Sequence, residues 1–517
     1  MKLLTAKQMS DIDRLTIERG TPGIDLMRNA GKAVFDLIVE KILVSPEDRI
    51  VVLAEKGNNG GDGHRIAELL AKNGCAVELF LTGKKTDVRG DARTCMQDAE
   101  TAGLPVKEIL ENCGLETVRR SIESADVIVD ALFGTGLKGD IRGLPAFLIN
   151  VINNSDATVV AVDVPSGVNA STGEVSKETI RADYTVTFGF FKVGHVFGPG
   201  KQFCGDISIA DIGFNPEVTE ASESFGCILS GSEAAELVPK RPYNAHKGTA
   251  GRVFVLTGSV GMTGASVLSS MAALRIGAGL VTAGCPASLN DILEVKLTEA
   301  MTLPLPEVRK KRCLSLRALG MVRKAAGKAD IVAVGPGLGV YHETAELVRR
   351  FLGGYSERVV LDADGLNAFK GRADVLAESE CEMVLTPHPG ELAGIMDMTI
   401  SDIVENPVKA AKEAAEATGK IVLLKGSPSV MVGPDGAVWI NPTGNEGMAT
   451  AGMGDVLTGV IAGLAAQGLT LFDAALLGAY IHGRAGDLAA DIEGIHGLTA
   501  GDVLDLLPQA IIELKEM

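Results

Sequence analysis

The sequence has few aromatic residues and no surplus of basic ones. Only 4% of its 517 residues are Phe, Trp or Tyr, and a single Trp is present. The 49 Lys and Arg stand against 66 Asp and Glu, which leaves a net charge of −17. A protein this acidic, without a basic cluster, is not expected to bind nucleic acid or an anionic membrane. Local dipoles would have to hold an anionic ligand, as the N-terminal end of a helix does.

Cysteine pairs and long apolar runs are also missing. The eight cysteines are scattered singly, at positions 75, 95, 113, 204, 227, 285, 313 and 381. Without CxxC spacing, neither a zinc site nor a disulfide framework is expected, and a reducing compartment fits best. The start lacks the apolar core of a signal peptide, and no run reaches the roughly 18 apolar residues of a membrane span. We therefore expect a cytoplasmic protein.

Glycine and aliphatic residues dominate instead. The chain has 62 Gly, and 46% of its residues are hydrophobic. This composition is typical of closely packed helices and strands with many glycine turns, so we predict an α/β protein. A chain of 517 residues is too long for one hydrophobic core, so at least two domains are expected.

Short apolar runs alternate with helical patterns in both halves, which predicts parallel sheets covered by helices. In the first half the runs are 50–54, 77–81, 127–132, 159–164 and 184–188. In the second half they are 253–256, 280–283, 331–334, 359–361, 384–386 and 421–425. A β-hairpin is predicted over 429–441. The polar segment 215–224 is typical of a linker, so we predict domains at 1–218 and 225–517.

The most informative motif of the first half directly follows its first predicted strand. It reads Lys56-Gly57-Asn58-Asn59-Gly60-Gly61-Asp62-Gly63. Four glycines exceed the need of a tight turn, and they let backbone N–H groups approach an anion closely. A helical pattern follows, which places a helix N-terminus beside this predicted ligand-binding loop. Further polar loops at 130–136 and 163–167 end two other strands, at the edge where parallel sheets bind ligands.

In the second half, Gly452-Met453-Gly454-Asp455 opens an apolar helix. Its free N–H groups can hold a phosphate, and Asp455 can take a proton from a hydroxyl that attacks that phosphate. The alternative is that Asp455 only caps the helix. Polar loops at the other strand ends favour phosphoryl transfer; they are 335–339, 362–365, 386–391 and 425–429. The P-loop motif GxxxxGK[ST] does not occur.

One histidine stands out among these loops. His388 lies between Pro387 and Pro389. Prolines fix the backbone of such a loop, which favours a ligand role for His388 over a purely structural one.

Together these motifs resemble the bifunctional NAD(P)H-hydrate repair enzymes of bacteria and archaea. In that family an NAD(P)HX epimerase domain is fused to an ADP-dependent (S)-NAD(P)HX dehydratase domain. The likeness spans nearly the whole chain and implies a Rossmann-like three-layer domain followed by a ribokinase-like domain. It rests on residues 57–63, 130–137, 163–167, 192–195, 246–249, 335–339, 386–391 and 452–455.

The resemblance implies residue roles in the first domain, whose substrates would be the R and S forms of hydrated NADH and NADPH (NADHX and NADPHX). Asp130 would be the catalytic carboxylate. A potassium ion would be held by Asn59, Ser166 and a backbone oxygen at Val127. The substrate contacts would be Asn58, Asn59, Gly60, Gly61, Asp62, Ala131, Leu132, Phe133, Gly134, Thr135, Gly136, Leu137 and Asp163.

In the second domain the resemblance implies that Asp455 is the catalytic base. It would activate the ring hydroxyl for phosphorylation by ADP, with Mg²⁺, and loss of phosphate would then restore NAD(P)H and leave AMP. The hydrate would lie against Ala265, Gly337, Gly339, His388 and Asp455. The nucleotide would lie against Lys425, Gly426, Ser427, Pro428, Ser429 and Gly454. A homo-oligomer is also implied.

Three residues depart from the family pattern. Met453 stands where a small residue is common, His64 where an aromatic or aliphatic residue is usual, and Glu55 where glycine is frequent. None of them removes a proposed catalytic group. Met453 leaves the N–H donors in place, although its bulk would crowd a phosphate if it pointed toward one.

The residues alone leave two other functions open. A ribokinase-like small-molecule kinase with a fused domain would use Asp455 and the same glycines, and it would release a stable phosphorylated product. A nucleotide-sensing or protein-interaction module would need no catalysis in the first half. The carboxylates of Asp62, Asp130 and Asp163 argue against this second alternative.

Overall fold

The computed structural model describes residues 1–43, 45, 47–111, 113–137 and 139–516. The chain divides into two compact units, Met1–Gly226 and Cys227–Met517. Both are built on parallel sheets with their own buried cores, which confirms the predicted α/β class. Among the described residues, no helix is long and apolar enough to cross a membrane.

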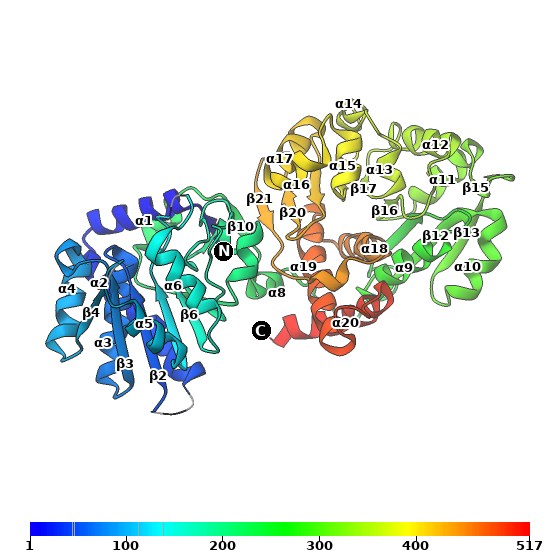
Figure 1. The fold of residues 1–517 in the computed structure, drawn as a ribbon. Coiled ribbons are helices and arrows are strands. Elements are labelled where there is room, and N and C mark those ends of the chain that lie inside the picture. The colour runs from blue at the N-terminus through cyan, green and yellow to red at the C-terminus, as the bar shows by residue number, and fades with distance from the viewer. Residues whose placement is uncertain (44, 46, 112, 138, 517) are drawn as a thin grey trace. The chain divides into compact units, whose positions relative to one another are not determined.

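The first unit is a seven-stranded parallel sheet of order β4-β3-β2-β5-β6-β7-β9 (Figure 1). Its helices form two outer layers, because α2, α3 and α4 share one core and α5 and α6 share another. This is the predicted three-layer arrangement. The strands are β2 (Arg49–Ala54), β3 (Ala76–Thr82), β4 (Val106–Ile109), β5 (Val127–Ala131), β6 (Thr158–Val162), β7 (Tyr184–Phe188) and β9 (Asp206–Ala210). The helices are α2 (Gly23–Leu37), α3 (Asn58–Lys72), α4 (Gly90–Thr101), α5 (Leu115–Glu123) and α6 (Gly143–Asn153).

Smaller elements complete this unit. Strand β1 (Lys2–Leu4) pairs with β8 (Phe191–Lys192), and α1 (Ala6–Glu18) follows β1. The predicted linker is a helix, α7 (Pro216–Ala221), because the Asn215 side chain accepts hydrogen bonds from the first N–H groups and Val218 packs into a small core with α1. The buried Val218 and the Lys2 ammonium, which donates to the carbonyls of Thr219, Glu220 and Ser222, thus attach this polar segment to the first unit.

The second unit has a mainly parallel sheet of order β13-β12-β11-β16-β17-β18-β19-β20-β21-β10. Only β19-β20-β21 is antiparallel, and β20 and β21 form the hairpin predicted over 429–441. The strands are β10 (Gly226–Ile228), β11 (Arg252–Leu256), β12 (Leu280–Pro286), β13 (Met301–Leu305), β16 (Ile331–Val334), β17 (Arg358–Leu361), β18 (Glu382–Leu385), β19 (Ile421–Leu424), β20 (Val430–Val432) and β21 (Val438–Ile440). A separate ribbon joins β14 (Glu307–Val308) to β15 (Cys313–Leu314).

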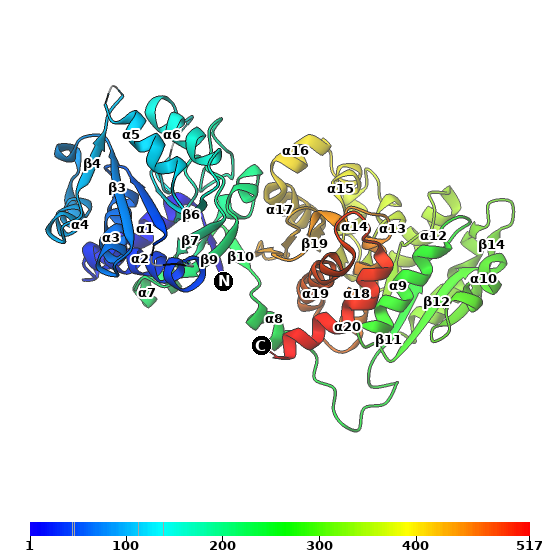
Figure 2. The same ribbon diagram turned by 60° about the horizontal axis from the view of Figure 1, so that its bottom comes forward.

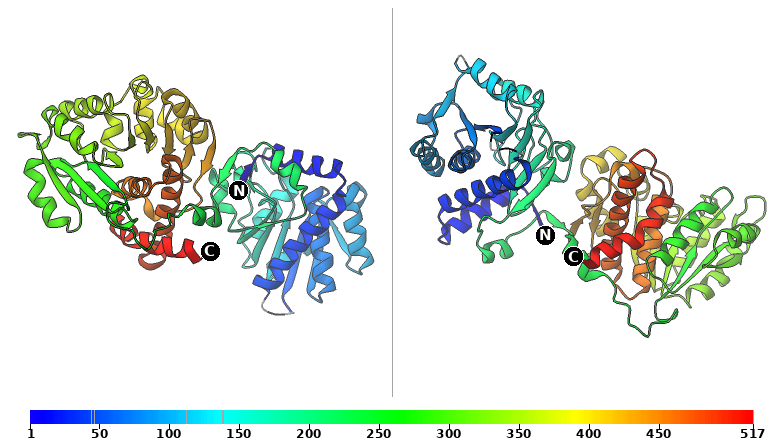
Figure 3. Two further views of the ribbon diagram at one scale, coloured as in Figure 1. Left: turned by 180° about the vertical axis from the view of Figure 1, so that it is seen from behind. Right: turned by 90° about the horizontal axis from the view of Figure 1, so that it is seen from below.

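Helices α9 (Thr263–Arg275), α18 (Met453–Ala466), α19 (Leu471–Glu493) and α20 (Ala500–Glu516) share the large core of this unit (Figure 2). The C-terminal α20, red in Figure 3, packs against α9 and α19. The remaining helices are α8 (Gly231–Leu237), α10 (Asn290–Lys296), α11 (Leu319–Ala326), α12 (His342–Leu352), α13 (Asp364–Asn367), α14 (Ala373–Ala377), α15 (Pro389–Ile395), α16 (Ile400–Glu405) and α17 (Pro407–Thr418).

The glycine-rich segment after β2 is not a loop, because helix α3 already begins at Asn58. Its glycines do not have positive φ angles. They are needed for close packing: a Cβ on Gly60 would lie 1.7 Å from the carbonyl oxygen of Glu55, and one on Gly63 would lie 2.5 Å from the Cβ of Ala131. The glycines therefore hold the first turn of α3, with its free N–H groups, tightly against the ends of β2 and β5.

His64 on α3 is fully buried, and neither ring nitrogen has a hydrogen-bond partner. Burial lowers the pKa of His64 to about 4. Unpartnered buried polar atoms destabilise a fold, so we expect His64→Leu to raise the free energy of unfolding of the first unit by ~1 kcal/mol. The unfolded histidine binds a proton near its ordinary pKa, whereas the folded one does not until pH is near 4. The increase in the free energy of unfolding caused by His64→Leu should therefore grow as pH falls from about 6.5 toward 4.

Urea unfolding followed by circular dichroism tests this expectation. The single tryptophan, Trp439 in β21, reports on the second unit, so the transition seen by its fluorescence should stay where it is in the parent. A variant less stable than the parent at pH 5 would show that His64 makes a stabilising contact.

Candidate functional sites

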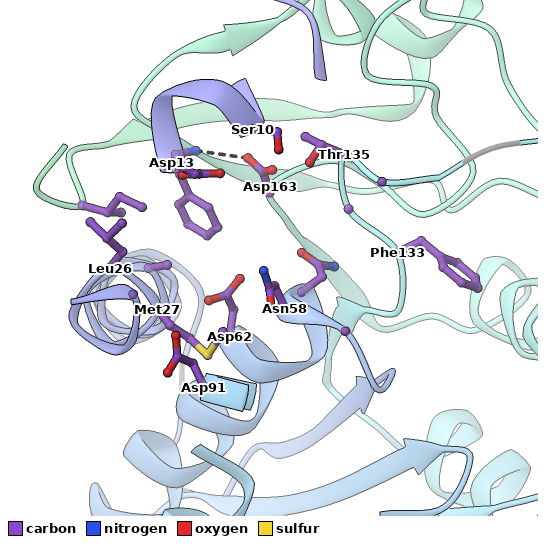
Figure 4. A pocket seen from close by; sticks show the side chains of 18 of the residues that line it. Ser10, Asp13, Leu26, Met27, Asn58, Asp62, Asp91, Phe133, Thr135 and Asp163 are labelled. Carbon is purple, nitrogen blue, oxygen red and sulfur yellow. Dashed lines mark hydrogen bonds between the residues drawn. The ribbon is translucent and has the colours of Figure 1, made fainter. Parts of the chain in front are cut away.

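A cavity of about 740 Å³ lies at the carboxyl edge of the first sheet (Figure 4). Its walls come from α1, α2, the first turn of α3 and the segments that follow β5 and β6. The predicted substrate contacts Gly60, Gly61 and Ala131 are buried and do not line it. The predicted contacts that do line it are Asn58, Asn59, Asp62, Leu132, Phe133, Gly134, Thr135, Gly136, Leu137 and Asp163.

Five carboxyl residues line this cavity, namely Asp13 on α1, Glu55 after β2, Asp62 on α3, Asp91 on α4 and Asp163 after β6. Three of them, Asp13, Asp62 and Asp163, have shifted pKa values. Burial raises the pKa of Asp62 well above its usual value, and the charges of Asp163 and Asp13 add to the increase. Burial and the charge of Asp163 raise the pKa of Asp13 to about 6, against the opposing charge of Lys192. The sequence did not point to Asp13, because an acidic residue on an amphipathic helix is usually solvated.

Asp163 differs from the other two because Lys192 lies beside it. The Lys192 ammonium is completely buried and donates to Asp163 Oδ1 at 2.5 Å, to Thr187 Oγ1 at 2.8 Å and to the Phe188 carbonyl at 3.0 Å. Burial alone would raise the pKa of Asp163, but the charge and hydrogen bond of Lys192, with smaller contributions from His195 and the Phe188 N–H, together outweigh burial, and the pKa lies below its usual value. The cavity therefore combines one carboxyl group whose pKa is lowered with two whose pKa values are raised.

The structure places Asp130, for which a catalytic role is predicted, at the carboxyl end of β5. Its side chain is completely buried and does not line the cavity. It accepts hydrogen bonds from the Ser166 backbone N–H (2.8 Å), the Ser166 hydroxyl (2.6 Å) and the Leu132 N–H (3.3 Å). Burial raises the pKa of Asp130 to about 6, although these bonds oppose the change. Asp130 thus fixes the two loops that end β5 and β6, and its catalytic role stays a prediction.

The structure also separates Val127 from the other predicted potassium ligands. Val127 begins β5, where it pairs with Ile50 and Thr158, whereas Ser166 contacts Asp130, three residues further along that strand. Three strand residues span about 10 Å, too far for one ion to bridge. The oxygens that do lie beside Ser166 Oγ are Asp130 Oδ1 at 2.6 Å and the Phe133 carbonyl at 3.2 Å.

In the second unit, the polar motifs follow neighbouring parallel strands. Gly335 follows β16, Asp362 follows β17, Thr386 follows β18 and Lys425 follows β19, and these four strands are adjacent in the sheet. Their carboxyl ends therefore share one edge. The N-terminus of α18 lies at the same place, because a Cβ on Gly454 would lie 3.2 Å from Lys425 Nζ and 3.6 Å from Asp362 Oδ2.

Asp455 is not the cap of α18. The cap is Gly452, in a left-handed conformation with φ of 94°, and Asp455 lies three residues further on. Burial and the neighbouring carboxylate of Asp362 raise the pKa of Asp455 to about 7, against the opposing charge of Lys425. Because Gly452 occupies the cap position, Asp455 is not the N-cap, and a half-buried carboxylate that titrates near neutrality suits the predicted general base. The Met453 side chain packs into the hydrophobic core and does not crowd the free N–H groups.

A chain of polar contacts lies beneath Gly454. Asp362 accepts from Lys425 Nζ at 2.8 Å on one oxygen and from the Thr458 hydroxyl at 2.7 Å on the other. Glu391 Oε2 lies 3.7 Å from Lys425 Nζ. Burial would lower the pKa of Lys425, but these two carboxylates outweigh it and raise the pKa. Sequence reasoning noted the motifs of Asp362 and Glu391 without assigning them roles, because only the fold shows that they share one lysine.

The other predicted residues of this unit lie around the same edge. His388 caps α15: its Nδ1 accepts from the N–H groups of Gly390 (3.0 Å) and Glu391 (3.2 Å), while most of its side chain is exposed. A Cβ on Gly337 would lie 3.0 Å from the Cβ of Ala265, which places these two residues side by side. Gly339 donates its N–H to Asp364 at 2.7 Å.

Two family models match the chain. Residues 23–194 match the family described as YjeF-related protein N-terminus, and residues 253–509 match NAD(P)H-hydrate dehydratase. The bifunctional NAD(P)H-hydrate repair enzyme Nnr of Moorella thermoacetica is 43% identical over 100% of this chain and 98% of its own length. The enzyme of that name from Escherichia coli is 32% identical over 94% of this chain and 89% of its own length.

A solved structure is similar to the second half. It is the ADP/ATP-dependent NAD(P)H-hydrate dehydratase from Bacillus subtilis, co-crystallised with ATP and Mg²⁺. It is 28% identical, with a TM-score of 0.50, and the match covers 56% of this chain and 99% of that one.

Proposed function

Because the chain belongs to the family of bifunctional NAD(P)H-hydrate repair enzymes, we propose that its two units divide the repair of hydrated NADH and NADPH between them. The first unit exchanges the R and S hydrates, and the second dehydrates the S form at the expense of ADP. The observation that best supports this division is that each unit has its own group of polar side chains, at the carboxyl ends of its own parallel strands.

The dehydration needs a leaving group better than hydroxide. Asp455 takes the proton of the ring hydroxyl, whose oxygen attacks the terminal phosphate of ADP and releases AMP. The phosphorylated hydrate then loses phosphate from one ring carbon and a proton from the adjacent one, which restores the double bond of the reduced nicotinamide. Lys425 and the free N–H groups of Gly454 and its neighbours stabilise the charge on the transferred phosphoryl group. Mg²⁺ commonly reaches such sites on the phosphates of the nucleotide and would supply further positive charge there.

Asp455→Asn should stop dehydration, because the amide cannot accept the proton. We expect kcat to fall by about 10²- to 10⁴-fold, the usual contribution of a general base, while ADP binding persists. Since the pKa of Asp455 is about 7, kcat of the parent should fall as pH decreases through about 7.

Return of absorbance from the reduced nicotinamide measures this reaction, and the R–S exchange of the same molecule is the control, because Asp455 lies in the other unit. Near-normal turnover by the variant would remove Asp455 from the reaction. A stable phosphorylated product from the parent would instead identify the kinase alternative.

Exchange of the R and S hydrates requires the carbon–oxygen bond at the ring carbon to break and to re-form on the other face. A protonated Asp62 gives its proton to the departing hydroxyl, and the ionised Asp163 takes a proton from the water that adds. Two carboxyl groups whose environments shift their pKa values in opposite directions are the usual sign of such an acid and base. Asp13 lines the same cavity, and its charge helps to raise the pKa of Asp62.

A potassium ion fits the oxygens beside Ser166. Asn59 would ligate the ion through Oδ1, which lies beside the segment after β5, because a Cβ on Gly134 would be 3.0 Å from that oxygen. With Val127 excluded by distance, the donors are Asn59, the Ser166 hydroxyl, Asp130 and the Phe133 carbonyl. A cation held there would attract the diphosphate of the substrate in a cavity whose described lining residues include no Lys or Arg.

Asn59→Ala should weaken the dependence of R–S exchange on potassium and slow the exchange itself, because one oxygen ligand is lost. Given a mixture of hydrates and ADP, the full-length variant should consume the S form quickly and the R form only at the spontaneous rate. If the R form vanished as fast as with the parent, the first turn of α3 would not belong to the exchange site.

The two units should also work apart. Helix α7 packs on α1 and β10 pairs with β21, so the cut suggested by the fold is between residues 225 and 226 and not at 218. We expect fragment 1–225 to exchange the hydrates and fragment 226–517 to dehydrate the S form. Two folded fragments that lack both activities would contradict the proposed division.

A cytoplasmic location, a homo-oligomeric state and the preference between NADHX and NADPHX stay predictions. Gel filtration of the full-length protein tests the oligomeric state, and competition between the two hydrates for dehydration tests the preference.

A further inference from the structure

His195 and Lys192 belong to the sequence motif 192–195, to which the proposed reactions assign no role. Both side chains are almost completely buried, and both contact Asp163. Lys192 ends β8, and His195 ends the 3₁₀ turn Val193–His195 that follows directly. Asp163 comes from a distant part of the chain, after β6.

The three residues form a closed ring of hydrogen bonds. Lys192 Nζ donates to Asp163 Oδ1 at 2.5 Å, and the Lys192 backbone N–H donates to His195 Nδ1 at 3.1 Å. Because Nδ1 accepts, the proton of the neutral imidazole lies on Nε2, which donates to the Asp163 carbonyl at 3.0 Å. Each residue therefore holds the next one, and His195 connects the backbone of the lysine to the backbone of the aspartate.

The backbone of Asp163 needs such support. Its φ angle is +65°, a left-handed conformation that residues other than glycine adopt rarely and mostly where the surroundings enforce it. The carbonyl held by His195 belongs to the peptide that follows this angle, so the imidazole fixes the direction in which the chain leaves Asp163.

The carboxylate has one occupied and one available oxygen. Oδ1 accepts from Lys192, from the Thr187 hydroxyl at 3.0 Å and from the Phe188 N–H at 3.3 Å. Among the hydrogen bonds of the described residues, none reaches Oδ2, and Asp163 lines the cavity (Figure 4). The ring thus holds one edge of the carboxylate and leaves the other for a substrate.

We infer that His195 is a positioning residue of the R–S exchange. It fixes the left-handed backbone of Asp163 and the position of Lys192, which donates a hydrogen bond to the Asp163 carboxylate. The inference rests on the proposed function of the first unit. Because Nδ1 and Nε2 each have a partner, the imidazole orients groups and does not itself reach the substrate.

A double-mutant cycle in the full-length protein tests this role. His195→Leu leaves the Asp163 carbonyl and the Lys192 N–H unpaired, and we expect kcat of exchange to fall by about 10- to 100-fold, the usual cost of losing an orienting partner. His195→Gln keeps one donor and one acceptor and should retain activity within about threefold of the parent. In an Asp163→Asn background, His195→Leu should cause no further loss, because residues that act through one group are not additive.

Controls separate this effect from misfolding. ADP-dependent dehydration by the same molecule should stay unchanged, and His64→Leu, which alters another buried histidine of the first unit, should leave exchange unchanged. If His195→Leu does not fold, His195→Asn, which is too short to reach both partners, replaces it in the cycle.

Three results decide the matter. A full additional loss in the Asp163→Asn background, or normal exchange by folded His195→Leu, would overturn the inference. Loss of dehydration together with exchange would reveal a general structural role and overturn it as well. Absence of exchange in the parent protein would instead contradict the proposed function of the first unit.

Discussion

Each unit has an ammonium–carboxylate pair at the carboxyl end of its sheet, and the surrounding site is arranged about that pair. The Lys192 ammonium is buried, whereas the Lys425 side chain is partly exposed. Lys192 lies 2.5 Å from Asp163 in the first unit, and Lys425 lies 2.8 Å from Asp362 in the second. Removing such charges from water costs several kcal/mol per ion, so a buried pair persists only when further hydrogen bonds complete it. In both units a threonine hydroxyl donates to the carboxylate and supplies part of that completion.

The pairs also set the protonation of the carboxyls around them. In the first unit Asp163 keeps its charge, and that charge together with burial favours the protonated form of Asp62. In the second, burial and the charge of Asp362 raise the pKa of Asp455 to about 7, which suits a base that works near neutral pH. One physical arrangement thus provides an acid and a base for exchange in the first unit and a single base for phosphoryl transfer in the second.

Periodicity predicted the α/β class and most central strands, because strands buried on both faces are continuous apolar runs. Edge strands such as β4 and β9 were missed, since their half-exposed residues break the apolar pattern. The glycines after β2 correctly marked a site, but for the wrong reason: they permit close packing of α3 and do not form a flexible loop.

Contacts between distant segments could not be predicted from local patterns. Asp13 reaches the cavity from α1, 45 residues before Asn58 in the first turn of α3, and no motif surrounds Asp13 in the sequence. The roles of Asp130 and Val127 rest on resemblance alone. The fold buries the Asp130 side chain behind the loops and places Val127 at the start of its strand, away from Ser166. Asp362 and Glu391 could not be recognised from the sequence as partners of Lys425, because only the adjacent strands of the fold bring them to the same edge.

The most direct test of the account is a product count with the full-length protein, a mixture of R and S hydrates of NADH, and ADP. Reduced nicotinamide is followed by absorbance, and AMP and phosphate are measured at the end. The account predicts that NADH returns from both hydrates, with one AMP and one phosphate for each NADH formed. A phosphorylated hydrate that accumulates without return of absorbance, or recovery that stops once the S form is consumed, would contradict it.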